Sequence, residues 1–133
     1  MAKRLLDTSL LIPFFRGRRR QYESPTVQDA AAWARELIHI HGDGVIASPV
    51  YLEFTCGVDD DQEMSLALAF LDEFENIDGG HISDEDWKIA IQRAQRIFYP
   101  GRKRQVVDCL LFAIARRLNC DLKTKDRDLR RRR

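Results

Sequence analysis

The sequence has 133 residues, of which 44 % are hydrophobic and 32 % are charged. This balance excludes a disordered or fibrous chain, and the length predicts a single domain over residues 1–133. No run reaches the roughly 18 apolar residues of a membrane span, and we expect no secretory signal and no membrane partner. Three cysteines, none in a C-x-x-C pair, exclude a disulfide scaffold or a zinc ribbon and predict a cytoplasmic protein.

The formal net charge of +1 conceals a strong segregation of charge along the chain. Residues 58–86 carry 11 Asp and Glu and no Lys or Arg, whereas residues 87–133 carry 15 Lys and Arg against 4 Asp and Glu. Such asymmetry suggests a polyanionic partner. The densest basic runs are Arg102, Lys103 and Arg104, and the terminal residues 130–133, which we expect to form a flexible tail.

The chain opens with an apolar run, 3–7, that predicts a buried strand ending on an acid. Thr8 and Ser9 are residues that favour helix N-caps, and the apolar side chains after them predict a short helix that stops by Gly17. Pro13 fits this helix in or near its first turn, where backbone N–H groups lack partners in any case.

The alternation of strands and helices continues to the end of the chain. Capping residues and apolar side chains at helical spacing predict helices over 26–41, 48–57, 64–74, 83–97 and 107–118. For the helix at 48, Ser48 is expected to be the N-cap and Pro49 the first helical residue. Short apolar runs predict strands at 45–47, 75–77 and 121–124. This order indicates an α/β fold with a central parallel sheet of about four to five short strands and helices on both faces.

Four carboxylates fall where a strand ends or a helix starts: Asp7, Glu53, Asp108 and Asp126. One such acid is ordinarily a cap or a turn residue, but ligands of parallel sheets bind beyond the carboxyl ends of the strands. Several acids in apolar surroundings repel one another unless a cation lies among them. Oxygen ligands favour Mg²⁺ or Mn²⁺ over zinc, and such an ion beside a basic rim predicts metal-assisted phosphodiester hydrolysis.

At these acids the sequence resembles the motif blocks of PIN-domain nucleases. The four blocks, in chain order, are LLDTSLLI (5–12), SPVYLEFTCG (48–57), VDCLLFAIA (107–115) and LKTKDRDL (122–129). Together they span nearly the whole chain. Proteins of this length and motif spacing look most like the VapC toxins of type II toxin–antitoxin modules.

The resemblance implies a PIN-like fold and a Mg²⁺- or Mn²⁺-dependent endoribonuclease. Its catalytic and metal-binding acids would be Asp7, Glu53, Asp108 and Asp126. Hydroxyls that orient these carboxylates would belong to Thr8, Ser9 and Thr124. Contacts to the RNA backbone are expected from Arg102, Lys103 and Arg104. In that family the substrates are structured RNAs of the tRNA or rRNA class, the toxin commonly forms a homodimer, and a cognate antitoxin blocks the site.

Two other interpretations remain open from the sequence. A catalytically silent RNA- or DNA-binding module would use the basic third as an electrostatic clamp, and its salt-dependent binding would not respond to Asp7→Asn. A PIN-domain nuclease that processes RNA outside toxin–antitoxin systems would carry the same acids. The remaining candidates are expected to be structural: His39, His41, His81 and Cys109. No G-x-x-x-x-G-K-[ST] segment is present, which excludes a P-loop NTPase.

Overall fold

The computed structural model describes residues 3–97 and 106–124. Within these ranges four parallel strands form one sheet in the order β3-β2-β1-β4. The strands are β1 (Arg4–Leu6), β2 (Val45–Ile46), β3 (Glu75–Asn76) and β4 (Asp121–Lys123). Leu5 of β1 pairs with Val45 on one side and with Leu122 on the other. The predicted parallel α/β sheet is confirmed.

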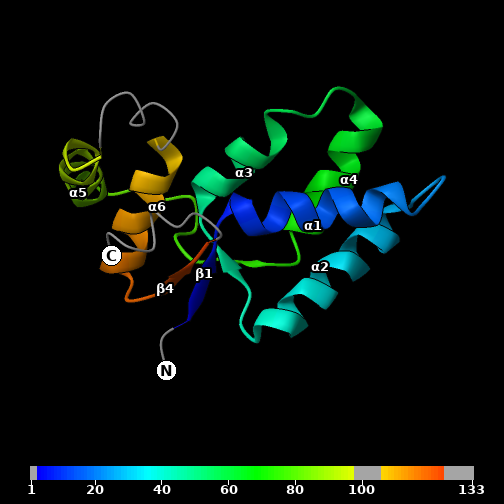
Figure 1. Cartoon of the computed structure of the whole chain (residues 1–133), viewed down its shortest axis with the longest axis horizontal. Coiled ribbons are helices and arrows are strands. Elements are labelled where there is room, and N and C mark those ends of the chain that lie inside the picture. The colour runs from blue at the N-terminus through cyan, green and yellow to red at the C-terminus, as the bar shows by residue number, and fades with distance from the viewer. Residues whose placement is uncertain (1–2, 98–105, 125–133) are drawn as a thin grey trace.

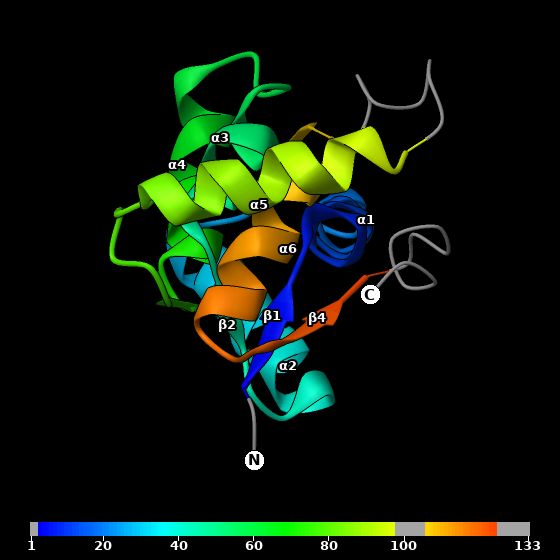
Figure 2. The same cartoon turned by 90° about the vertical axis from the view of Figure 1, so that its left-hand side faces the viewer.

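Helices cover both faces of this sheet, as predicted. They are α1 (Thr8–Arg20), α2 (Val27–His41), α3 (Ser48–Thr55), α4 (Asp61–Leu71), α5 (Asp84–Gln95) and α6 (Val106–Arg117). Helices α5 and α6 lie on one side of the strands, and α1, α2 and α4 lie on the other, with α3 near the carboxyl ends of the strands (Figure 1). Figure 2 looks onto the α5–α6 side. None of the helices in the described ranges is long and apolar enough to cross a membrane.

The core is one hydrophobic cluster to which strands and helices both contribute. Leu5 and Leu6 of the central strand β1 and Leu122 of the edge strand β4 are buried because helices cover both faces of the sheet. Helices α1 to α4 meet in an aromatic cluster in which Phe15 packs against Phe54 and Phe70 with ring centroids 5.3 and 5.2 Å apart. This cluster fixes the rotation of α3 about its axis, and therefore the direction in which the residue before Phe54 points.

Two helix starts differ by one residue from the prediction. The N-cap of α1 is Asp7, not Thr8 or Ser9, and its side chain accepts from the backbone N–H of Ser9. The N-cap of α3 is Ala47, not Ser48, and it makes no side-chain cap bond. In both cases the residue that ends the strand still has extended backbone, which is the conformation of an N-cap, so the helix follows directly.

Helix α1 also runs further than its sequence predicts. The expected stop at Gly17 is wrong, because this glycine lies within the helix, which continues to Arg20. A glycine weakens a helix interior by only about 1 kcal/mol, and the burial of Leu11 and Phe15 in the core offsets that loss. Pro13 lies in the second turn rather than the first, where its ring cannot donate a bond to the carbonyl of Ser9.

Candidate active site

The carboxyl ends of β1 and β4 define the site. Asp7 follows β1 and Thr124 follows β4, and the backbone N–H of Asp7 donates to the carbonyl of Lys123 at 3.1 Å. The two strands are neighbours although one opens the chain and the other comes near its end. Strand β1 is therefore where the strand order changes direction, the place at which open parallel sheets bind ligands.

Asp7 is 1 % exposed and is held by donors from the next turn. Its carboxylate accepts from the backbone N–H of Ser9 at 2.9 Å and from the Ser9 hydroxyl at 2.5 Å. The Ser9 oxygen lies 3.0 Å from the hydroxyl oxygen of Thr124, which joins the ends of β1 and β4. The position at the N-terminus of α1 further stabilises a negative charge. The hydroxyl of Ser9 thus contacts the first acid, and that of Thr124 lies beside it.

Glu53 reaches the same place from α3. The hydroxyl of Thr8 donates to its Oε1, so the residue after Asp7 contacts the second acid. Glu53 is half-buried, and its neighbour Phe54 lies in the aromatic cluster. Packing of Phe54 therefore turns Glu53 toward the edge of the sheet.

Asp108 is the third residue of α6 and is half-buried beside Cys109. Burial raises the pKa of the Cys109 thiol, the charge of Arg93 opposes this, and the charge of Asp108 adds to it. The thiol is therefore protonated at neutral pH and is not a nucleophile. The burial and protonation of this thiol fit the prediction that Cys109 is a structural residue.

Asp7, Glu53 and Asp108 line one cavity of about 280 Å³. The other lining residues are Thr8, Ser9, Ile12 and Pro13. The donors are oxygens, with no His or Cys among the lining residues, and this chemistry fits Mg²⁺ or Mn²⁺. Across residues 3–97 and 106–124, however, no three His, Cys, Asp or Glu side chains gather closely enough to hold an ion. Among the residues that the structure describes, the cavity thus has the right donors without a complete metal cluster.

Several predicted site residues lie outside the described ranges. They are Asp126, the basic residues Arg102, Lys103 and Arg104, and the terminal run 130–133. Three of the four predicted acids are therefore brought together by the described part of the chain.

A second cavity of about 320 Å³ adjoins the first and was not predicted from the sequence. It shares Ile12 and Glu53 with the first cavity, and Phe15 and Phe54 contribute apolar surface. Its charged lining residues are Arg16, Arg19, Asp59, Asp60 and Glu63. The side chains of Arg19 and Glu63 form an ion pair at 2.7 Å across it. The acidic run after Gly57 was the available signal, but nothing in the sequence shows that this run faces α1.

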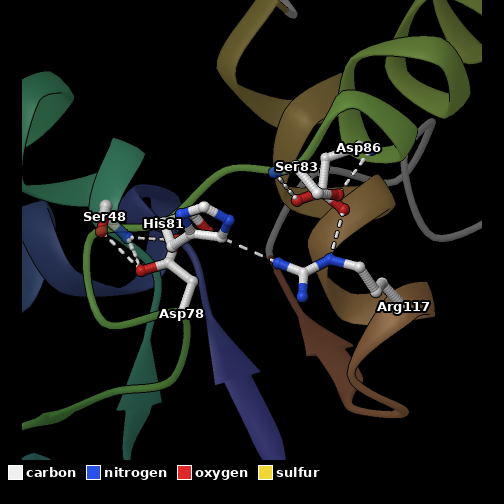
Figure 3. A network of polar contacts seen from close by, with 6 residues as sticks. All are labelled: Ser48, Asp78, His81, Ser83, Asp86 and Arg117. Atoms are coloured by element: carbon white, nitrogen blue, oxygen red, sulfur yellow. Dashed lines mark hydrogen bonds and ion pairs between the residues drawn. The ribbon is translucent and has the colours of Figure 1, made fainter.

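Asp78 was also missed. It follows β3 at the same edge of the sheet, and its carboxylate contacts Ser48 at the start of α3 (Figure 3). The signal was an acid directly after the predicted strand 75–77, at the carboxyl end of a strand as Asp7 is. The strand itself has only two residues, which made its end hard to locate.

A parallel α/β sheet with an acidic, oxygen-lined cavity at its carboxyl edge has the chemistry for phosphodiester cleavage assisted by a divalent metal. The family comparison is more specific. The family described as PIN domain matches residues 4–133, and the chain belongs to this family. PIN domains are in general metal-dependent nucleases, which are hydrolases. None of the curated proteins compared with the sequence matches it.

Proposed function

We propose that this PIN domain is a Mg²⁺- or Mn²⁺-dependent endoribonuclease that cuts structured RNA of the tRNA or rRNA class. We further propose that it is the toxin of a type II toxin–antitoxin pair. One observation supports the nuclease activity: Asp7, Glu53 and Asp108 line the same cavity, and three separate elements bring them to one edge of the sheet. The toxin role is supported by the VapC-like spacing of the motif blocks.

In this proposal Asp7 and Asp108 are the core metal ligands, and Glu53 and Asp126 complete the set. The bound cation would lower the pKa of a water and stabilise charge on the scissile phosphate. Ser9 holds the Asp7 carboxylate in a fixed orientation, and Thr8 does the same for Glu53.

Substrate binding is proposed to use the basic residues that adjoin α6 in the sequence. Arg102, Lys103 and Arg104 directly precede the helix that carries Asp108. Lys and Arg near the site would attract the RNA backbone and make its binding salt-dependent.

Two protein partners are proposed. The second cavity offers apolar surface and unlike charges next to Glu53, which suits an antitoxin segment that combines basic and apolar side chains. A second copy of the chain is the other partner, since Trp87 and Ile91 lie one turn apart on α5 and are 50 % and 58 % exposed.

Cleavage of total RNA by the purified wild type and by Asp7→Asn, in Mg²⁺, Mn²⁺ or EDTA, tests the nuclease. We expect the wild type to cut only with metal and Asp7→Asn to lose cutting while it still binds RNA. Asparagine is as good an N-cap as aspartate, so the substitution removes the charge and keeps the start of α1. Asp60→Asn is the matched control, because Asp60 also caps a helix with its carboxylate, at the N–H of Glu63, and lines the second cavity but not the first.

The outcomes separate the nuclease from its alternatives. Equal cutting by Asp7→Asn would reject the assigned site. RNA binding without cutting under any condition would favour the silent binding module. Metal-dependent cutting without growth arrest on expression in the native host would favour an RNA-processing nuclease over a toxin.

A further inference from the structure

Helix α3, which carries Glu53, lacks a side-chain cap of its own. Its N-cap residue is Ala47, whose methyl group accepts no bond from the first-turn N–H groups. The helix has eight residues, too few to be stable by helix propensity alone. Contacts with neighbouring elements therefore decide where α3 lies.

Asp78, in the loop after β3, caps α3 from outside. Its carboxylate accepts from the backbone N–H of Ser48 at 3.1 and 3.2 Å and from the Ser48 hydroxyl at 2.5 Å. Figure 3 shows these bonds joining the loop to the start of the helix. The same carboxylate accepts from the N–H of Gly80 at 3.0 Å, which fixes its own orientation. Asp78 thus holds the first residue of α3 by backbone and side chain together.

The loop has a conformation that presents this carboxylate. Gly79 and Gly80 have φ of +60° and +82°, which side chains rarely adopt. The backbone N–H of His81 closes the turn on the carbonyl of Asp78 at 2.9 Å. The two glycines therefore let the chain turn back, so that the backbone N–H of Gly80 points at the Asp78 carboxylate.

The far end of the same segment is fixed to α6, the helix that carries Asp108. Arg117, the last residue of α6, donates from Nε to the Asp86 carboxylate at 2.7 Å and from Nη2 to the carbonyl of His81 at 3.5 Å. Asp86 also forms a capping box with Ser83 at the start of α5. The segment 78–86 therefore links the start of α3 to the end of α6 (Figure 3).

We propose that Asp78 is a positioning residue for Glu53, an inference that rests on the proposed function and on the part that Glu53 has in it. Glu53 is five residues from Ser48 on the same short helix, and its carboxylate contacts Thr8 next to Asp7. A tilt or slide of α3 moves Glu53 relative to the other acids. A misplacement of about 1 Å in an active site can reduce a rate about 100-fold.

Asp78→Ala tests the proposal, because it removes the acceptor for three donors: the backbone N–H and hydroxyl of Ser48 and the N–H of Gly80. The assay is single-turnover cleavage of end-labelled total RNA with enzyme in excess. We expect the plateau rate to fall about 10- to 100-fold, as for other residues that orient metal ligands. The enzyme concentration at half-plateau should stay within about twofold, since RNA binding does not use α3. Binding of Mn²⁺ alone, followed by its EPR signal, should weaken in parallel.

A double-mutant cycle shows whether Asp78 acts through Glu53. In a Glu53→Gln background, Asp78→Ala should lower the plateau rate no further. Thr26→Ala is the matched structural control, because it removes the cap of α2 and Thr26 lines neither cavity. Ser48→Ala is a milder second variant. It keeps the backbone N–H bond to Asp78 and removes the hydroxyl, which donates to Asp78 and accepts from the Asn76 amide at 3.4 Å. It should act in the same direction to a smaller extent.

Each outcome decides one of the two proposals. A wild-type plateau rate and Mn²⁺ affinity in folded Asp78→Ala, or effects that add fully to those of Glu53→Gln, would overturn the positioning role. If Asp78→Ala does not fold, unchanged values in Ser48→Ala would overturn it instead. A wild type that cuts no RNA would reject the proposed function, whereas Mn²⁺ binding weakened by both Asp78→Ala and Glu53→Gln would still support the positioning role.

Discussion

Asp7 is both the cap of a helix and a candidate metal ligand. It caps α1, and it is the most buried of the described acids that line the cavity. Its position was predictable, because an acid that ends an apolar run stands at the carboxyl edge of a parallel sheet. Its role as the cap was not, since Thr8 and Ser9 are equally good cap residues and only the backbone conformation distinguishes them.

Ser9→Ala is the sharpest test of the contacts around Asp7. The substitution removes the hydroxyl that donates to Asp7 and lies 3.0 Å from the hydroxyl of Thr124. The backbone N–H of residue 9 still donates to the Asp7 carboxylate, so the cap of α1 is kept. We expect metal-dependent cleavage to fall about 10- to 100-fold and the half-saturating Mg²⁺ concentration to rise. A Mg²⁺ titration of RNA cleavage measures both quantities. Ser65→Ala, whose hydroxyl bonds only the carbonyl of Asp61, is the control, and an equal loss there would contradict the assignment.

At the scale of elements, substitutions at two glycines measure how backbone conformation affects the stability of α1 and α2. Gly17 lies inside α1, and an added Cβ there would meet no atom within 4 Å. We expect Gly17→Ala to raise the free energy of unfolding by about 0.5–1 kcal/mol, because alanine loses less backbone entropy on folding. Urea denaturation measures the change.

Gly42 is the opposite case. It follows the last turn of α2 with φ of +87°, so Gly42→Ala should lower the free energy of unfolding by about 1–2 kcal/mol. Equal effects at Gly17 and Gly42 would show that space, rather than backbone conformation, decides these positions. Sequence alone does not distinguish the two positions, because neighbouring residues do not reveal the φ of a glycine.

At the scale of the whole molecule, the ion pair between Asp86 and Arg117 joins α5 to α6. Burial raises the pKa of Asp86, but the Arg117 guanidinium and the Ser83 donors outweigh it, so the pKa lies below its ordinary value. A carboxylate with a lowered pKa stabilises the fold at pH values above its unfolded pKa of about 4. That contribution is lost as the pH falls through the folded value.

Arg117→Met should therefore lower the free energy of unfolding by about 2–3 kcal/mol at pH 7, since it leaves a buried carboxylate without its cation. The difference from the wild type should shrink below about pH 4, where Asp86 becomes protonated. Urea denaturation between pH 3 and 7 measures both trends. Arg18→Met removes the surface pair with Glu36 and should change stability little. A difference that is constant with pH would mean that Arg117 acts by packing alone.

The proposed homodimer is a prediction about the surface of the molecule. Ile91→Asp places a charge in the middle of the exposed apolar turn of α5 and should convert a dimer to a monomer. Light scattering after size-exclusion chromatography measures the mass. Gln92→Asp puts the same residue at the neighbouring exposed position and should leave the dimer intact. A monomeric wild type would reject this interface.

The sequence by itself determined the class of fold and the edge at which the site lies. Strands that alternate with helices favour a parallel sheet, and all parallel strands end at one edge, so Asp7, Glu53 and Asp108 could be assigned to it without coordinates. Only the tertiary structure revealed the contacts of Asp78 with Ser48 and of Asp86 with Arg117. These pairs are 30 and 31 residues apart. They form because packing sets how each helix is rotated and where each loop returns, which local patterns do not encode.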